Sequence, residues 1–237
     1  MPAGLFGKLP DKRDFVASLA PRSFLEVWEP WLQASLATSR QILGSDWNDA
    51  YNRAPIWRYW LGAGLSGEAT IGAFMASVDG VGRSFPLTIF ICEGGQSLPP
   101  PEIEANDAWF EAAEALLLSA LDPAVNFDLL AQGVAGLALP VLQSRRGEAP
   151  GIAEMADGAV LVRGPGDRTD QAFGEARLFG HRRFYALQSC WWTIGGEDYP
   201  PLALAVVGMP SPTCFADMLT GAFVGYSGRS EEISHGR

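Results

Sequence analysis

The residues best suited to chemistry lie together in one short stretch, SVDGVGRSFPLTIF, which runs from residue 77 to residue 90. It places the carboxylate of Asp79 four residues before the guanidinium of Arg83, with Gly80 and Gly82 between them. A glycine-rich turn with a basic residue can cradle phosphate, because its backbone N–H groups can converge on an anion. The stretch therefore raises two hypotheses: a phosphate-handling enzyme that uses Asp79 and Arg83, or a structural turn between two strands.

The spacing within this stretch favours the turn. A phosphate-binding P-loop has four residues between its glycines, then Gly-Lys-Ser/Thr, then a helix whose first turn meets the phosphate. Here one residue separates the glycines, arginine replaces lysine, and Pro86 with the β-branched residues after it predicts a strand. Asp-Gly is typical of a hairpin turn, and Gly82 adds a second permissive backbone position. We expect Asp79 to accept backbone hydrogen bonds, and Arg83 either to pair with Asp79 or to face a partner.

Other catalytic and metal-binding patterns have little support. The two histidines are His181 and His235, and the three cysteines are Cys92, Cys190 and Cys214, none of them in a close pair. Structural zinc sites use four ligands at short spacings, so a zinc site would need long-range assembly of these residues. Free thiols in a reducing compartment are the simpler interpretation. We expect no catalytic residue, no cofactor and no metal.

The charge of the chain excludes some classes of partner. The net charge is −10, which argues against a nucleic-acid-binding surface and against attraction to an anionic bilayer. The densest positive patch is formed by Arg182 and Arg183 with Arg177 and His181. It could be a phosphate or phosphopeptide site or a solvated edge. No apolar run reaches the ~18 residues that span a bilayer, and the first residues lack the apolar core of a secretory signal. We expect a cytoplasmic protein with no direct membrane insertion.

Apolar periodicity predicts helices and strands that alternate in blocks. Helices are expected at 23–44, 45–55, 103–122, 123–137 and 211–221; strands are expected at 56–64, 69–78, 85–92, 158–164, 182–195 and 201–208, after short extended pieces within 4–16. Residues 140–157 are polar and rich in breakers, which predicts a surface loop. The pattern predicts a single α/β domain over residues 1–225, with helices on both faces of a mixed sheet, and a polar flexible tail at 226–237.

Tryptophan is abundant, with eight residues, and two pairs fall within expected strands. Trp57 and Trp60 should lie on opposite faces of one strand, and Trp191 and Trp192 on opposite faces of another. Exposed tryptophan often anchors protein–protein contacts, whereas helices on both faces of the sheet would bury these side chains. The candidate protein-binding residues combine strand tryptophans with charged residues. They are Trp57, Arg58, Asp79, Arg83, Trp191 and Trp192.

Several segments together resemble the TagF/ImpM family, accessory proteins of the bacterial type VI secretion system. They are GLFGKLPDKRDFV (4–16), FLEVWEPWLQASL (24–36), PIWRYWLGAG (55–64), SVDGVGRSFPL (77–87), SCWWTIG (189–195) and GMPSPTCFADMLTG (208–221), in the family order. One departure is Arg13, which stands where the family pattern KLPxxGDFV has glycine. A role that needs a positive φ at this position is therefore in doubt.

The resemblance implies a three-layer αβα sandwich and a regulatory rather than catalytic role. TagF-like proteins are cytoplasmic, post-translational repressors of secretion-system assembly, and no catalytic residues are assigned to the family. They act with or beside a threonine-phosphorylation pathway, so the expected partner is a forkhead-associated-domain protein or another cytoplasmic secretion component. A structural subunit of the apparatus is a further alternative, although the sequence has no coiled coil or repeat that favours it.

Overall fold

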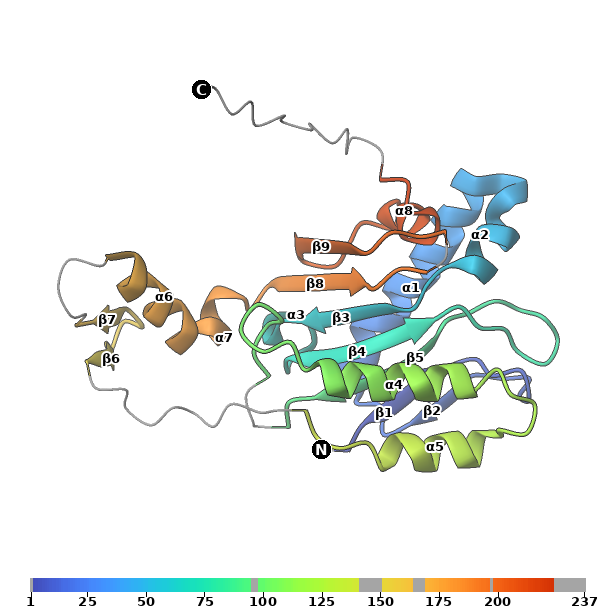
Figure 1. Ribbon diagram of the computed structural model, residues 1–237, viewed down its shortest axis with the longest axis horizontal. Coiled ribbons are helices and arrows are strands. Elements are labelled where there is room, and N and C mark those ends of the chain that lie inside the picture. The colour runs from blue at the N-terminus through green and yellow to red at the C-terminus, as the bar shows by residue number, and fades with distance from the viewer. Residues whose placement is uncertain (1, 95–97, 141–150, 164–168, 197, 224–237) are drawn as a thin grey trace, which may run out of the picture.

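The computed structural model describes residues 2–94, 98–140, 151–163, 169–196 and 198–223. Its centre is a seven-stranded sheet in the order β2-β1-β5-β4-β3-β8-β9 (Figure 1). The strands are β1 (Gly4–Gly7), β2 (Val16–Ser18), β3 (Trp57–Leu61), β4 (Thr70–Met75), β5 (Leu87–Cys92), β8 (Gln188–Thr193) and β9 (Leu202–Val207). The predicted tail at 226–237 lies outside the described residues.

All neighbouring strands of this sheet run antiparallel, so the prediction of a mixed sheet is wrong. Short connections join β3 to β4, β4 to β5, and β8 to β9. Such connections favour antiparallel neighbours, because a parallel pair of strands needs a long crossover. The continuous apolar run of β5 had suggested a strand buried on both faces. That burial is present, since every residue of β5 is buried, but it occurs here in an antiparallel sheet.

Three helices pack against one face of the sheet: α1 (Arg22–Leu43), α2 (Trp47–Arg53) and α8 (Cys214–Thr220). This face carries a cluster of aromatic side chains. The Trp28 ring of α1 lies 4.4 Å from Tyr59 of β3 and 5.8 Å from Trp191 of β8, measured between ring centroids. Such aromatic contacts add to the apolar area that the cluster removes from water, so this face forms a large part of the core.

Two helices pack against the opposite face: α4 (Asp107–Ser119) and α5 (Phe127–Ala135). Trp60, Ile71 and Ile89 of the sheet join Phe110 and Leu117 of α4 in a second buried cluster. Alternate residues of β3 therefore enter different clusters, because side chains along a strand alternate between faces. The short helix α3 (Ala63–Ser66) follows β3, and a 3₁₀ turn, η1 (Gly44–Asp46), follows α1.

A smaller group of elements projects from one end of the sheet, at the left of Figure 1. It contains a hairpin of β6 (Ile152–Glu154) and β7 (Val160–Val162), followed by α6 (Thr169–Phe179) and α7 (His181–Phe184). Two predictions are corrected here. Part of the loop expected at 140–157 is strand β6, while residues 141–150 lie outside the description. The strand expected at 182–195 begins only at Gln188, because α7 occupies the preceding turn.

Candidate functional site

The turn at residues 77–85 connects β4 to β5, as the sequence predicts. Val78 and Ser84 form an antiparallel bridge, and the Asp79 amide donates to the Arg83 carbonyl at 3.1 Å. The Gly82 amide in turn donates to the Asp79 carbonyl at 2.9 Å, and Gly82 has the expected positive φ, +82°. The stretch is thus a tight connection between two antiparallel strands, with no helix after it.

The Asp79 carboxylate is buried and fully engaged. One oxygen accepts the amide hydrogens of Val81 and Arg83 at 3.1 and 2.8 Å. The other accepts Arg83 Nε at 2.6 Å and lies 2.9 Å from Lys8 Nζ. A carboxylate has about four lone-pair sites, so these four donors leave no free acceptor for a substrate proton or a metal.

The surroundings of Asp79 act on its pKa in opposite directions. Removal from water acts to raise the pKa, while the hydrogen bonds from Arg83, Lys8 and Val81 act to lower it. The hydrogen bonds prevail and hold the pKa of this carboxyl well below its ordinary range. Asp79 is therefore ionised near neutral pH and serves as a fixed anion rather than as a proton carrier.

The segment between β1 and β2 is hydrogen-bonded to this turn. Ser77 Oγ donates to the Lys8 carbonyl at 2.7 Å, and the Gly80 amide donates to the Lys12 carbonyl at 2.7 Å. A Cβ on Gly80 would lie 3.0 Å from the Pro10 carbonyl oxygen, so this close approach favours glycine. The sequence predicts Arg83 as a partner of Asp79 but not Lys8. The only two lysines of the chain, Lys8 and Lys12, both lie in this segment, and this concentration is the sequence signal that could have pointed to Lys8.

Arg13, which replaces the family glycine, fits this arrangement. Within the described residues, positive φ among non-glycine residues occurs at Leu19 and Asn106, so Arg13 adopts an ordinary backbone conformation. Its carbonyl accepts a hydrogen bond from the Arg83 guanidinium. Because the contact uses only the backbone carbonyl of residue 13, it does not depend on whether that residue is arginine or glycine.

The outer side of the two interlocked segments is accessible. The Arg83 side chain is 59% exposed although its Nε is paired, and Val81 at the tip of the turn is 57% exposed. Phe15 is 45% exposed and packs edge-on against Phe85, with 4.7 Å between ring centroids. We call the residues Phe15, Val81 and Arg83 the loop surface. It combines two apolar groups with one cation.

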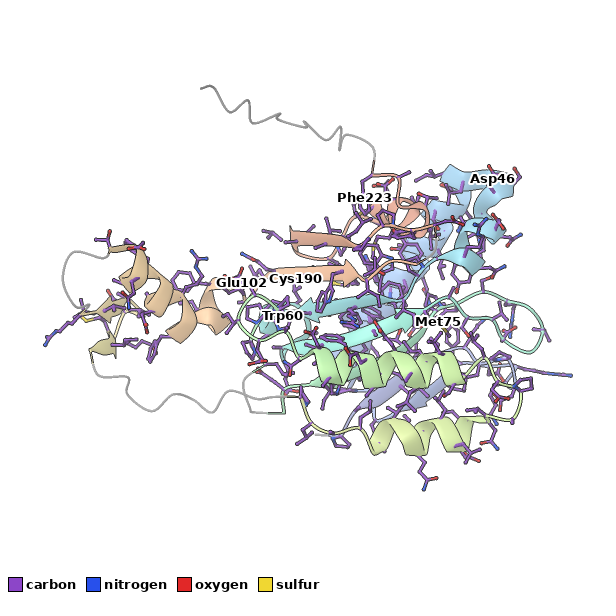
Figure 2. The ribbon with its side chains drawn as sticks, viewed as in Figure 1. Asp46, Trp60, Met75, Glu102, Cys190 and Phe223 are labelled. Atoms are coloured by element: carbon purple, nitrogen blue, oxygen red, sulfur yellow. The ribbon has the colours of Figure 1, made fainter. Side chains whose placement is uncertain are left out.

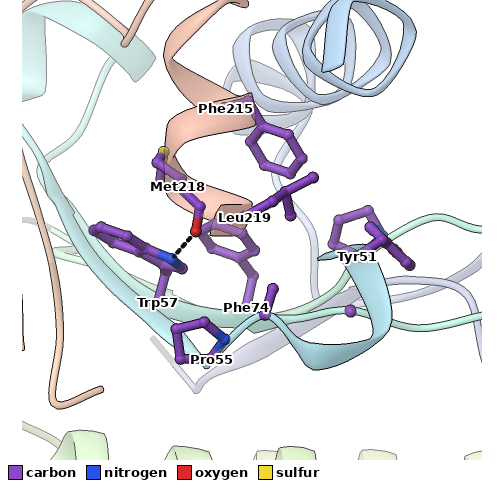
Figure 3. Close-up of a pocket in the computed structure, with 10 residues that line it drawn as sticks. Tyr51, Pro55, Trp57, Phe74, Phe215, Met218 and Leu219 are labelled. Atoms are coloured by element: carbon purple, nitrogen blue, oxygen red, sulfur yellow. Dashed lines mark hydrogen bonds between the residues drawn. The ribbon is translucent and has the colours of Figure 1, made fainter. Parts of the chain in front are cut away.

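The remaining predicted binding residues lie inside the fold. Trp57 and Trp191 are buried in the aromatic cluster, and Trp57 Nε1 donates to the Met218 carbonyl of α8 at 3.0 Å (Figure 3). Trp192 is half-buried on the opposite face, where its ring lies 4.9 Å from that of Phe110. Trp57 and Trp191 are therefore core residues in this structure, as expected for a sheet covered by helices on both faces.

Arg58 also points into the structure, toward α4. Its Nε and Nη2 donate to the two carboxylate oxygens of Glu114 at 2.6 and 3.0 Å, and its Nη1 lies 3.6 Å from Asp107 Oδ1. The guanidinium carbon lies 5.4 Å from the centre of the Phe110 ring, within cation–π range. Arg58 thus joins the sheet to α4 by a buried ion pair.

Two cavities lie in the described part of the chain, and one of them borders the base of this turn at Ala76 and Pro86. One, between β3 and α8, has a volume of about 10 Å³, which is room for about one water molecule (Figure 3). A larger surface hollow of about 330 Å³ lies beside the first turn of α4 and residues 137–140. Neither is lined by Asp79 or Arg83, so neither supplies a pocket for chemistry at the turn.

The cysteines are free thiols with raised pKa values. Burial raises the pKa of Cys190 to about 11, and the charge of Glu102 adds to the increase. Burial likewise raises the pKa of Cys214 to about 11, with a further contribution from the charge of Asp217. Figure 2 shows Glu102, Cys190 and Trp60 close together at one end of the sheet. Thiols with such pKa values are protonated near neutral pH and are therefore poor nucleophiles.

The described part of the chain gives two further results. It contains no group of three or more His, Cys, Asp or Glu side chains arranged to hold a metal ion. It also contains no helix with the length and apolar character needed to cross a membrane.

Of the predicted basic group, Arg177 and Arg183 are exposed, while the side chains of His181 and Arg182 lie outside the description.

Comparison with known proteins places this chain in a family. Residues 4–137, more than half of the chain, match the TagF N-terminal domain, which is type VI secretion system-associated. The crystal structure of PA0076 from Pseudomonas aeruginosa PAO1 is similar, with a TM-score of 0.77 and 31% sequence identity. The similarity covers 93% of this chain and 95% of PA0076. The comparison with curated proteins found no significant match. The family match, which spans both the turn and the segment hydrogen-bonded to it, shows that the chain belongs to the TagF family of type VI secretion-associated proteins.

Proposed function

We propose that this protein is a cytoplasmic regulator that represses assembly of the type VI secretion system after translation, by binding one of its components. The observation that carries the proposal is the match of residues 4–137 to a secretion-associated family. The free thiols support a reducing compartment, because disulfides are rare in the cytosol. A forkhead-associated-domain protein is the first partner to test, since the resemblance to TagF-like repressors implies that pathway.

The geometry of the turn supports binding rather than catalysis. A phosphate-handling enzyme would need Arg83 to point into a pocket where other polar groups converge. Instead, Arg83 pairs with Asp79 at 2.6 Å, and its outer side faces solvent beside Val81. All four acceptor sites of Asp79 are occupied by donors of the protein itself. We therefore propose a non-enzymatic role in which the loop surface contacts the partner.

The proposal is tested by substitutions on the loop surface. Val81→Asp places a charge at an exposed tip that makes no core contact, so the melting temperature should not change, whereas partner binding and repression should be lost. Leu118→Asp on α4 is the matched control, because Leu118 is an apolar residue of similar exposure, 54% against 57%. The measurements are affinity capture of secretion components, the amount of protein that the secretion system releases, and thermal unfolding.

Arg83→Ala separates a structural role from a recognition role. This variant removes the ion pair with Asp79 and the hydrogen bond to the Arg13 carbonyl. We expect its melting temperature and its partner binding to fall together. A variant that keeps its melting temperature but loses binding would show that Arg83 acts mainly in recognition. Recovery of neither the forkhead-associated-domain protein nor any other secretion component would remove the basis of the proposal.

A further inference from the structure

Among the described residues, β9 forms an outer edge of the sheet (Figure 1). β9 is the last strand in the sheet order, and no other described strand pairs with it on that side. Sheet edges are usually protected by short strands, charged side chains, internal proline or bulges. The opposite edge follows this rule, because β2 has three residues. β9 has six residues, Leu202–Val207, and no charged residue occurs between Asp198 and Asp217.

The pairing with β8 fixes which backbone groups of β9 face outward. The Gly208 amide donates to the Leu187 carbonyl at 2.7 Å, so these two residues form a hydrogen-bonded pair. Hydrogen-bonded and non-hydrogen-bonded pairs alternate along an antiparallel ladder. Val207 lies opposite Gln188, next to the Gly208–Leu187 pair, so Val207 and Gln188 form a non-hydrogen-bonded pair. Residues 202, 204 and 206 of β9 therefore direct their backbone groups toward β8. Residues 203, 205 and 207 then direct their N–H and C=O groups away from the sheet.

The side chains of the same three residues are exposed. Ala203, Ala205 and Val207 lie on the face away from the aromatic cluster, and Val207 is 79% exposed, the highest value among the large apolar residues described. The alternate residues of β9 are half-buried against that cluster. Within the part of the chain that the structure describes, β9 therefore offers an unpaired backbone edge together with small, uncharged side chains.

We propose that β9 pairs in antiparallel orientation with β9 of a second copy of this chain, about a twofold axis at Ala205. In this register Ala205 lies opposite Ala205 of the partner subunit, and Ala203 lies opposite Val207 of the partner subunit. All outward backbone groups then meet groups of opposite hydrogen-bonding type, giving about six hydrogen bonds from three pairs. The two sheets become one continuous sheet.

The charge of the chain favours this face for self-association. A twofold interface places the same patch of both copies together, so any charge near the axis meets its like. A chain with a net charge of −10 generally resists self-association for this reason. The uncharged run that contains β9 removes this penalty locally, and alanine at the axis avoids a steric clash. The inference does not rest on the proposed function.

The register can be tested by opposite charges at one position. Ala205→Glu and Ala205→Lys each place like charges across the axis, so each variant alone should be monomeric, whereas the wild type should show about twice the chain mass of 25.4 kDa. An equimolar mixture of the two variants should form a heterodimer, because Glu then faces Lys across the axis. The measurement is light scattering or sedimentation over a concentration series.

Matched controls are Ala115→Glu and Ala115→Lys, which introduce the same charges at an exposed alanine on α4. Both should remain dimeric. Circular dichroism should show that all four variants are folded, and a charge at the outward-facing Ala205 position leaves the pairing with β8 in place. A monomeric wild type at every concentration, dimeric Ala205 variants, or a mixture that fails to dimerise would each overturn the proposal.

Discussion

Replacement of Arg58 tests whether this residue supports the fold rather than a docking surface. In the structure its side chain is 5% exposed and that of Glu114 is 12% exposed, and two hydrogen bonds join them. Arg58→Met keeps an apolar stem beside Phe110 but leaves the Glu114 carboxylate buried without its cation. Removing one member of a buried ion pair typically costs about 3–5 kcal/mol. Asp107, which is 67% exposed, should contribute little to this loss.

The double variant Arg58→Met/Glu114→Leu separates the ion pair from the packing. Replacing both charged groups by apolar groups of similar volume is often neutral, because no charge remains buried without a partner. We therefore expect the double variant to recover most of the stability that Arg58→Met loses. The pair Arg22–Glu26 on α1 is the control, since its side chains are 92% and 60% exposed. Arg22→Met should cost less than about 1 kcal/mol.

Urea unfolding followed by tryptophan fluorescence gives these free energies by linear extrapolation. The reasoning would be refuted if Arg58→Met lost less than about 1 kcal/mol, well below the cost of an unpaired buried charge. It would also be refuted if the double variant were no more stable than Arg58→Met alone. Because a typical domain is stable by about 5–15 kcal/mol, the expected loss should also reduce the amount of folded protein in cells.

Two further predictions concern the turn between β4 and β5. The folded-state pKa of Asp79 lies below the ordinary value of about 3.9, so its carboxylate adds stability above that pH and this contribution is lost as the pH falls toward the folded-state pKa. Thermal melts from neutral to acidic pH should therefore show a smaller acid-dependent decrease for Asp79→Asn than for the wild type, and parallel curves would contradict this. Gly82→Ala should lower the free energy of unfolding by about 1 kcal/mol, because φ at this residue is +82°. A steric clash would not contribute, since a Cβ here would meet no neighbour within 4 Å. Gly82→Asn should cost less in the same unfolding assay, since asparagine tolerates positive φ, and equal losses would point to another cause.

Local signals in the sequence were sufficient to predict the turn at 77–85. Asp-Gly, Gly82 and the strand after Pro86 all act within a few residues of one another, and the structure has the corresponding bridge, positive φ and Asp79–Arg83 pair. The opposite faces of Trp57 and Trp60 also follow from a local rule, the alternation of side chains along a strand. The two residues indeed belong to different clusters.

Features that depend on distant contacts could not be predicted in this way. The sequence places Lys8 far from Asp79, and their ion pair forms only because β1 lies beside β5. Strand direction likewise depends on the complete order of the sheet rather than on the apolar pattern of β5. Helix α6 was missed because it carries exposed Phe173 and internal Gly174, which interrupt a recognisable apolar stripe.

The loop surface and the β9 edge lie on different parts of the same sheet, which makes the two proposals compatible. The loop surface is carried by the β1–β2 loop and the β4–β5 turn, and β4 is the nearest of these strands to β9, three spacings away in the strand order. With adjacent strands about 4.8 Å apart, three spacings amount to roughly 14 Å. Pairing through β9 would therefore leave both loop surfaces of a dimer free. Such a dimer could engage two copies of a partner at once, and linked binding sites strengthen attachment to a multivalent target without any new contact. If both proposals hold, a dimer would therefore bind a partner that is present in several copies more firmly than a single subunit.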